Sequence, residues 1–116
     1  MKLRQKISFA FAAVMIAVCS QTVSAKVASC EIMEQGKITF KNKCNFNPIG
    51  GGSFYLTNLD ENKPLVRSTM DITVHIVETG FAEVTASLRG GSNTRWGKAK
   101  RAGACWVGND FKVCAR

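Results

Sequence analysis

The sequence predicts an all-β fold: a small antiparallel sheet or barrel stapled by two disulfides. Three observations predict it. Short apolar-polar alternations follow one another closely, glycine-rich turns separate them, and the chain beyond residue 25 shows no long helical period. That part of the chain also carries an even number of cysteines. These features are typical of a small all-β domain.

The first 25 residues are predicted to be a secretory signal peptide. Three basic residues precede an apolar run from Ile7 to Cys19, and small side chains at Val23-Ser24-Ala25 suit cleavage after Ala25. The apolar run is too short for a membrane span, which needs roughly 20 residues. The alternative, a lipoprotein signal acylated at Cys19, is disfavoured because bulky Val18 stands directly before it. We therefore expect a single β domain at residues 26–116, periplasmic or secreted, without a transmembrane anchor.

Processing would leave four cysteines, and an exported short chain with this count is expected to form two disulfides. In CWVGNDFKVC, a turn at Asn109-Asp110 places Cys105 opposite Cys114, close enough for a bridge. Cys30 and Cys44 fit less simply, because a turn at Gln35-Gly36 sets Cys30 against Lys41. A bulge or a longer return of the chain is then needed, and the four cysteines allow three connectivities.

The stretch MDITVHIVETGFAEVTASL, residues 70–88, is expected to form the central hairpin. A three-residue loop at Glu78-Thr79-Gly80, between Val77 and Phe81, pairs Val74 with Val84 and gathers the apolar residues on one face. A loop of only Thr79-Gly80 would instead pair them with polar residues, so burial selects the first register.

Further strands are expected at residues 37–46 and 53–59. The loop at residues 47–52 separates them, and a turn at residues 60–64 follows. The segment RGGSNTRWGKAKR, residues 89–101, is expected to be a loop that leads into a strand ending at Cys105, because its alternation around Trp96 is irregular.

Little in the sequence indicates catalysis, and no catalytic residue, metal site or cofactor is predicted. The single histidine, His75, lies across from Glu83 in the preferred register, where it is expected to form a cross-strand pair. The cysteines lack redox and zinc spacings, and Gly50-Gly51-Gly52 lacks the lysine and helix of a phosphate-binding loop.

The positive charge is concentrated near the end of the chain. Three of the sixteen basic residues lie in the predicted signal peptide, so the remaining chain carries +5 rather than +8, and residues 89–116 hold seven basic residues against Asp110 alone. An anionic partner would relieve this repulsion, and guanidinium groups bind carboxylate and phosphate with two-pronged geometry. A solvated loop that keeps the protein soluble is the structural alternative. The predicted binding residues are Arg89, Ser92, Arg95, Trp96, Lys98, Lys100 and Arg101.

The segments SNTRWGKAKR and ACWVGNDFKVCA, within residues 92–116, resemble the C-terminal signature of small exported proteins of unknown function from alphaproteobacteria. A second similarity is to bacterial inhibitors of c-type lysozyme, which are small stapled β-barrels. In that family a serine-glycine loop and a later basic residue enter the lysozyme cleft. The similarity implies Gly90-Gly91-Ser92 and Lys98 or Lys100 as the corresponding residues, with Trp96 near the position of the family's tyrosine.

These observations predict an exported, non-catalytic binding protein whose basic C-terminal face engages an acidic envelope component, such as an acidic glycan or a phosphorylated lipid headgroup. Inhibition of a host c-type lysozyme is the alternative. A nucleic-acid partner is not expected, because the chain is exported and lacks a base-reading motif.

Overall fold

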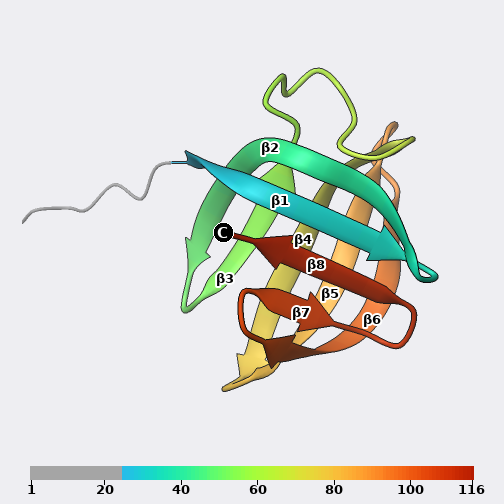
Figure 1. Cartoon of the computed structure of the whole chain (residues 1–116). Coiled ribbons are helices and arrows are strands. Elements are labelled where there is room, and N and C mark those ends of the chain that lie inside the picture. The colour runs from blue at the N-terminus through green and yellow to red at the C-terminus, as the bar shows by residue number, and fades with distance from the viewer. Residues whose placement is uncertain (1–24) are drawn as a thin grey trace, which may run out of the picture.

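The computed structural model describes residues 25–116, which form a closed barrel of eight antiparallel strands (Figure 1). Each strand pairs with the next along the chain, and the first also pairs with the last. The strands are β1 (Lys26–Glu34), β2 (Lys37–Gly50), β3 (Ser53–Thr57), β4 (Thr69–Glu78), β5 (Phe81–Leu88), β6 (Asn93–Ala102), β7 (Cys105–Val107) and β8 (Phe111–Ala115). The all-β prediction is confirmed. Residues 1–24, with nearly all of the predicted signal peptide, lie outside the described residues.

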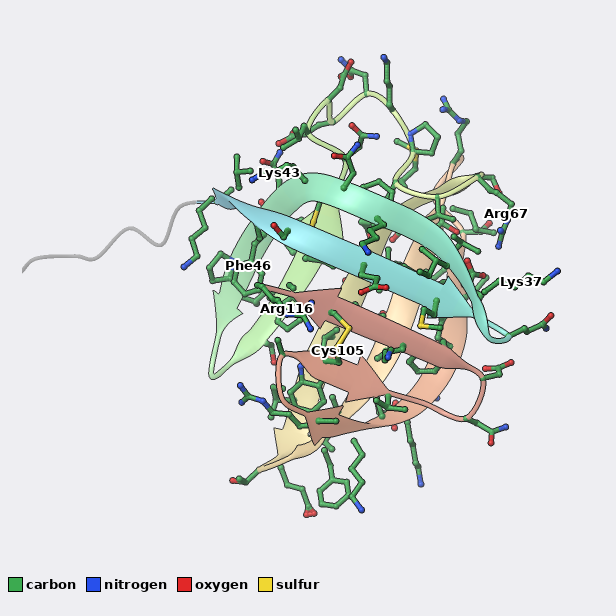
Figure 2. The ribbon with its side chains drawn as sticks, in the orientation of Figure 1. Lys37, Lys43, Phe46, Arg67, Cys105 and Arg116 are labelled. Carbon is green, nitrogen blue, oxygen red and sulfur yellow. A yellow bond between two sulfur atoms is a disulfide. The ribbon has the colours of Figure 1, made fainter. Side chains whose placement is uncertain are left out.

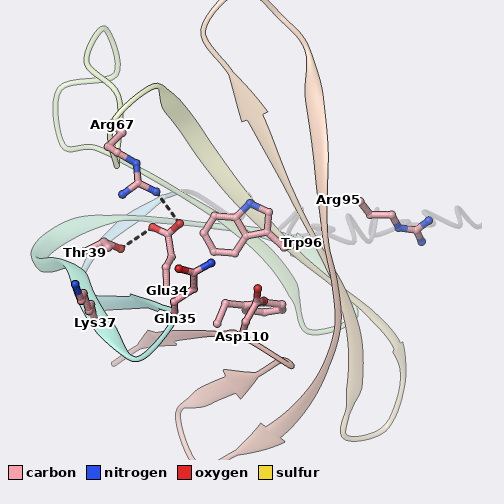
Figure 3. Close-up of a pocket in the computed structure, with 9 residues that line it drawn as sticks. Glu34, Gln35, Lys37, Thr39, Arg67, Arg95, Trp96 and Asp110 are labelled. Carbon is pink, nitrogen blue, oxygen red and sulfur yellow. Dashed lines mark hydrogen bonds and ion pairs between the residues drawn. The ribbon is translucent and has the colours of Figure 1, made fainter.

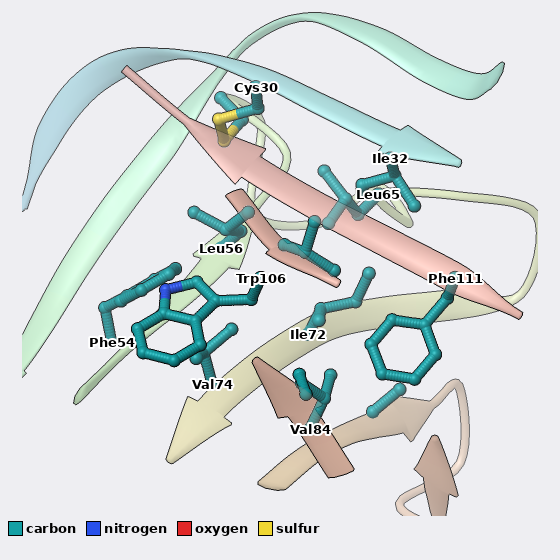
Figure 4. Close-up of a cluster of buried hydrophobic side chains, with 14 of the residues drawn as sticks. Cys30, Ile32, Phe54, Leu56, Leu65, Ile72, Val74, Val84, Trp106 and Phe111 are labelled. Atoms are coloured by element: carbon teal, nitrogen blue, oxygen red, sulfur yellow. A yellow bond between two sulfur atoms is a disulfide. The ribbon is translucent and has the colours of Figure 1, made fainter. Parts of the chain in front are cut away.

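The barrel interior is filled by side chains. Alternate residues of each strand point inward, as the two-residue period requires, and form one apolar cluster (Figure 4). Its fully buried members include Ile32, Leu56, Ile72, Val84 and Val113. Eight strands enclose a space just wide enough for such side chains. Ligands must therefore bind on the outer wall or at the two ends.

The β4–β5 hairpin has the predicted apolar register, with Val74 opposite Val84 and Ile72 opposite Ala86. The tip differs from the prediction. Glu78 pairs with Phe81, so the turn is Thr79-Gly80 alone, and the register shifts between Ile76 and Glu78. The shift adds one residue, Val77, and this bulge returns the apolar side chains to the inner face.

Two segments predicted as loops are largely strands. Strand β2 continues through residues 47–50, where Asn47 pairs with Tyr55 and Pro48 with Phe54. Residues 93–102 form β6, so the loop before it is limited to residues 89–92. The prediction for this segment was wrong because Trp96 is the extra residue of a bulge, with Val84 opposite Gly97 and Thr85 opposite Arg95. A bulge interrupts the alternation on which strand prediction depends.

Both expected disulfides form. Cys105 and Cys114 are directly opposite, with their Cα atoms 4.0 Å apart, and Gly108 donates its N–H to the Phe111 carbonyl at the predicted turn. This bridge faces the outside of the wall, because the neighbouring pair Trp106 and Val113 faces the core (Figure 2).

The second bridge, Cys30–Cys44, lies inside the barrel and belongs to the core cluster. A bulge after Ile32 moves Cys30 from Lys41 to Asn42, and Cys44 pairs with Ala28. The bridge therefore runs diagonally between strands, with the Cα atoms 5.9 Å apart. A bulge was one of the two expected ways to bring these cysteines together, and the diagonal geometry covers the remaining two residues.

Candidate functional site

The predicted binding residues are spread over the barrel and do not share one face. Arg89 and Ser92 are in the β5–β6 turn. Arg95, Lys98 and Lys100 are on the outer wall, while Trp96 and Arg101 are at opposite ends of the barrel.

Turns alternate between the two ends of an up-and-down barrel. The end that carries the β1–β2, β3–β4, β5–β6 and β7–β8 turns contains Trp96 and is called the Trp96 end. The other contains Trp106 and is called the Trp106 end. Figure 2 shows Lys37 and Arg67 toward the Trp96 end and Phe46 toward the Trp106 end.

The β5–β6 turn at the Trp96 end is tightly held by the backbone. The N–H of Leu88 donates to the Ser92 carbonyl at 2.6 Å, and the N–H of Arg89 donates to Ser68 in the next turn at 3.0 Å. The side chains of Arg89 and Ser92 remain exposed. They are far from Lys100, which lies eight residues beyond Ser92 on β6.

On the outer wall, Arg95 forms an ion pair with Glu83 of the neighbouring strand. Glu83 also lies opposite Lys98 on one side and opposite His75 on the other, as the sequence predicted for His75. The positive charge of Arg95 is therefore already neutralised by Glu83, an acidic residue that lies outside the C-terminal segment.

A mixed row of cations and apolar side chains runs across the outer wall. Lys100 lies between Phe81 of β5 and Val107 of β7, and Val107 lies between Lys100 and Lys112 of β8. Phe81 is 45% exposed and Val107 39% exposed. The Lys100 ammonium stands 6.0 Å from the Phe81 ring centroid. We call Lys98 and this row, Phe81, Lys100, Val107 and Lys112, the basic wall.

Sequence reasoning missed Lys112 as a binding residue. It lies outside RGGSNTRWGKAKR, and only the pairing of β7 with both β6 and β8 brings it beside that segment. The signal was nevertheless present. The predicted Cys105–Cys114 register places Lys112 opposite Val107 with its side chain outward.

The Trp106 end is an apolar mouth of about 550 Å³, with Phe46, Phe54 and Ile76 in its lining. Cations lie over two of its three aromatic rings. The Arg101 guanidinium lies 5.8 Å from the Trp106 ring, and the Lys26 ammonium lies 5.8 Å from the Phe46 ring. Arg101 lies at this end of the barrel and therefore stands apart from the basic wall.

The Trp96 end holds a second hollow, of about 540 Å³, in which the side chains are mostly polar (Figure 3). Glu34 is fixed there by two hydrogen bonds, because Arg67 Nη2 and Thr39 Oγ1 each donate to its carboxylate at 2.7 Å. Trp96 packs edge-on against Phe111, with ring centroids 5.4 Å apart. We call this the Trp96 hollow, and its lining residues are Glu34, Gln35, Lys37, Thr39, Arg67, Arg95, Trp96, Asp110 and Phe111.

Two turns at this hollow contain non-glycine residues with left-handed backbones. Gln35, at φ +55°, and Gly36, at φ +78°, form the two-residue β1–β2 turn, as a type I′ turn requires. Arg67, at φ +52°, opens the turn between Val66 and Thr69, at a position where glycine is common in type II′ turns. A left-handed backbone costs a side-chain-bearing residue about 1–2 kcal/mol.

Replacing Gln35 with glycine is expected to stabilise the protein by about 0.5–1 kcal/mol, because relief of the left-handed backbone exceeds the added entropy of the unfolded chain. Urea unfolding measures this gain. Gly36→Ala in the same turn is the matched control and should lose about 1–2 kcal/mol. A Cβ there would meet no atom within 4 Å, so its loss reports backbone conformation alone. A destabilising Gln35→Gly would contradict the assignment of strain.

Within residues 25–116, no three His, Cys, Asp or Glu side chains are grouped closely enough to hold a metal ion. His75 is exposed on the outer wall opposite Glu83 and lines neither end of the barrel.

The fold and these surfaces define a small, closed up-and-down β-barrel with a filled core, a basic wall and two tryptophan-lined ends. Its two disulfides indicate an oxidising, non-cytoplasmic compartment. None of the described residues forms a helix that is long and apolar enough to span a bilayer. Comparison with known protein families, curated proteins and solved structures gave no match.

Proposed function

We propose that the protein is an exported, non-catalytic binding protein whose basic wall engages the phosphorylated headgroups of an anionic lipid surface in the cell envelope. One observation carries the proposal. Lys98, Lys100 and Lys112 stand together on the outer wall, and none of the ion pairs among residues 25–116 involves them. Lys98 lies opposite Glu83, but Glu83 is already paired with Arg95, so a net positive charge on this wall is left for a partner.

The spacing of the three lysines favours a partner with repeated negative charges. Lys98 and Lys100 are two residues apart on one strand, about 7 Å, and Lys112 is two strands from Lys100, about 10 Å. A surface of lipid headgroups offers a phosphate to each lysine.

The exposed apolar side chains favour lipid over an acidic glycan. Phe81 and Val107 lie in the same row as the lysines, and Val77, 56% exposed, lines a shallow hollow with Phe81 and Lys98. At a membrane surface these side chains can enter the boundary between headgroups and acyl chains while the ammonium groups contact phosphate. An acidic glycan has no acyl layer into which these side chains could insert.

The location of this surface fits the proposed route of export. A signal peptide at residues 1–25, cleaved near Ala25, would deliver the chain to the periplasm or the exterior. The disulfides support this proposal, because the cytosol keeps thiols reduced.

Vesicle co-sedimentation tests the proposal. The purified, oxidised protein should sediment with phosphatidylglycerol vesicles but not with phosphatidylcholine vesicles, and the bound fraction should fall steeply as salt rises, because exposed charges are screened. Equal binding to both vesicle types would overturn it.

Lipid and glycan are separated by the apolar members of the row. The Phe81→Ser, Val107→Ser variant should bind phosphatidylglycerol vesicles more weakly and heparin unchanged. Equal loss of both ligands would indicate general damage to the wall. Unchanged vesicle binding, with strong heparin binding, would favour an acidic glycan as the natural partner.

The geometry supports lysozyme inhibition less well. Ser92 at the β5–β6 turn and Lys98 on the wall are six residues apart along the chain, about 20 Å in a strand, so one narrow cleft does not readily take both. The alternative predicts loss of c-type lysozyme turnover at stoichiometric protein, relieved by Ser92→Ala. Unchanged turnover at excess protein would remove it.

A further inference from the structure

We propose that the Trp96 hollow binds a neutral saccharide. This inference goes beyond the proposed lipid-binding function and does not rest on it. Trp96 belongs to the cationic sequence segment, yet its ring turns away from the basic wall and into the barrel end (Figure 3). The wall therefore does not explain why a tryptophan stands there.

The hollow combines an aromatic side chain with planar hydrogen-bonding groups. Trp96 supplies a large apolar surface, and the Glu34 carboxylate, the Gln35 amide and the Arg67 guanidinium lie around the same space. A pyranose ring has an apolar C–H face and a rim of hydroxyls that both donate and accept hydrogen bonds. Aromatic surface and a few fixed polar groups are the complement of such a ligand.

The charges around the hollow balance, which selects a neutral ligand over an ion. Glu34 and Asp110 offset Lys37 and Arg67, and Arg95 is paired with Glu83 outside the hollow. Figure 3 shows Arg95 pointing away from the other lining residues. The volume of about 540 Å³ suits one or two sugar units.

The strained turns add an independent argument. Gln35 and Arg67 are the two described non-glycine residues with positive φ, and both line the Trp96 hollow. Glycine at either position would relieve the conformational strain of the positive φ angle, but it would remove the polar side chain. Strain that persists at such a site points to a role for the side chain itself.

The Trp106 end provides an internal contrast. Arg101 lies over the Trp106 ring, and Phe46, Phe54 and Ile76 make the lining of this end more apolar than that of the Trp96 hollow, so a sugar finds no open indole face there. The chain contains two tryptophans, one at each end. Each end therefore carries its own spectroscopic reporter.

The test is a titration of the ¹⁵N-labelled, oxidised protein with maltose, cellobiose and N,N′-diacetylchitobiose, followed by the two indole N–H signals. At least one disaccharide should shift the Trp96 signal saturably and leave the Trp106 signal unmoved. Trp96→Phe assigns the signals. No shift with any of the three sugars, or equal movement of both signals, would overturn the proposal.

Gln35→Gly separates binding from folding. It should weaken binding of the responsive disaccharide by about three- to tenfold, the effect of losing one neutral hydrogen bond, while the fold is retained. Asn109→Ala is the matched control, because it removes an exposed amide in the adjacent β7–β8 turn, and Asn109 itself does not line the hollow. Equal weakening by both variants, or none by Gln35→Gly, would count against a saccharide held by this site. Glucuronate, as a charged probe, should not bind more tightly than its neutral counterpart glucose, and tighter binding of the anion would refute the neutral assignment.

Discussion

Neutralising Lys98, Lys100 and Lys112 together to glutamine is expected to weaken binding to phosphatidylglycerol vesicles by about 100-fold. Each lysine near an anionic membrane surface contributes about 1 kcal/mol, and about 1.4 kcal/mol corresponds to a factor of ten. The three side chains lie on the outer wall and form no ion pair within the described chain, so their removal should leave the unfolding midpoint nearly unchanged. Vesicle co-sedimentation at low and physiological salt measures the effect.

The matched control removes the same charge elsewhere. Lys41, Lys43 and Lys63 are exposed on β2 and in the β3–β4 connection, away from the basic wall. The corresponding triple glutamine variant should keep most of the vesicle affinity. If both triple variants lose affinity equally, net charge rather than the basic wall attracts the membrane.

Loss of the inner disulfide should have the largest effect on stability. In Cys30→Ala, Cys44→Ala, the unfolded chain regains the freedom of a loop with a sequence separation of 14, worth about 3 kcal/mol, and the core loses two buried sulfur atoms, which brings the total to about 4 kcal/mol. This is a large share of the 5–15 kcal/mol that is typical for folded domains. Urea unfolding monitored by far-UV circular dichroism gives the free energy directly.

The outer disulfide serves as the comparison. Cys105→Ala, Cys114→Ala opens a loop with a sequence separation of 9, worth about 2.5 kcal/mol, and these cysteines, although buried, lie outside the core cluster. We therefore expect the smaller loss at this bridge. A larger loss than at Cys30–Cys44 would show that core burial does not set the order.

Much of the fold could be predicted because the local pattern and the tertiary packing agree. Val74 and Val84 face each other because a sheet with one buried face tolerates no one-residue slip. Cys105 and Cys114 were placed by counting outward from a two-residue turn. In both hairpins the partners are close in sequence, so the register depends on few residues.

The bulges account for most of the errors. The extra residues Val77 and Trp96 break the alternation while the strand continues. A bulge is stabilised by pairing with the opposite strand, because the extra residue keeps the apolar side chains on the inner face of the barrel. The sequence of one strand alone does not reveal that pairing. Trp96 was therefore placed in a loop, although it lies within β6.

The candidate site was harder to predict than the fold. A run of thirteen residues looks continuous in sequence, but strand alternation and the bulge direct its side chains to the wall and to the two barrel ends. Arg95 forms an ion pair with Glu83, and Arg101 lies over the Trp106 ring. Lys112 comes from another strand and lies in the same row as Lys100. Binding depends on which side chains share a surface, and that is a property of the closed barrel.

The sequence alone determined the all-β class, the main hairpin register, the facing positions of Cys105 and Cys114 and the excess of positive charge, because these follow from local alternation, turn chemistry and composition. Only the tertiary structure decided which cations remain free, that Trp96 and Trp106 lie at opposite ends, and that Gln35 and Arg67 meet around one hollow. The physical reason is closure of the barrel. Pairing β1 with β8 fixes the neighbours of every outward side chain across strands distant in sequence, and those neighbours set charge, exposure and access.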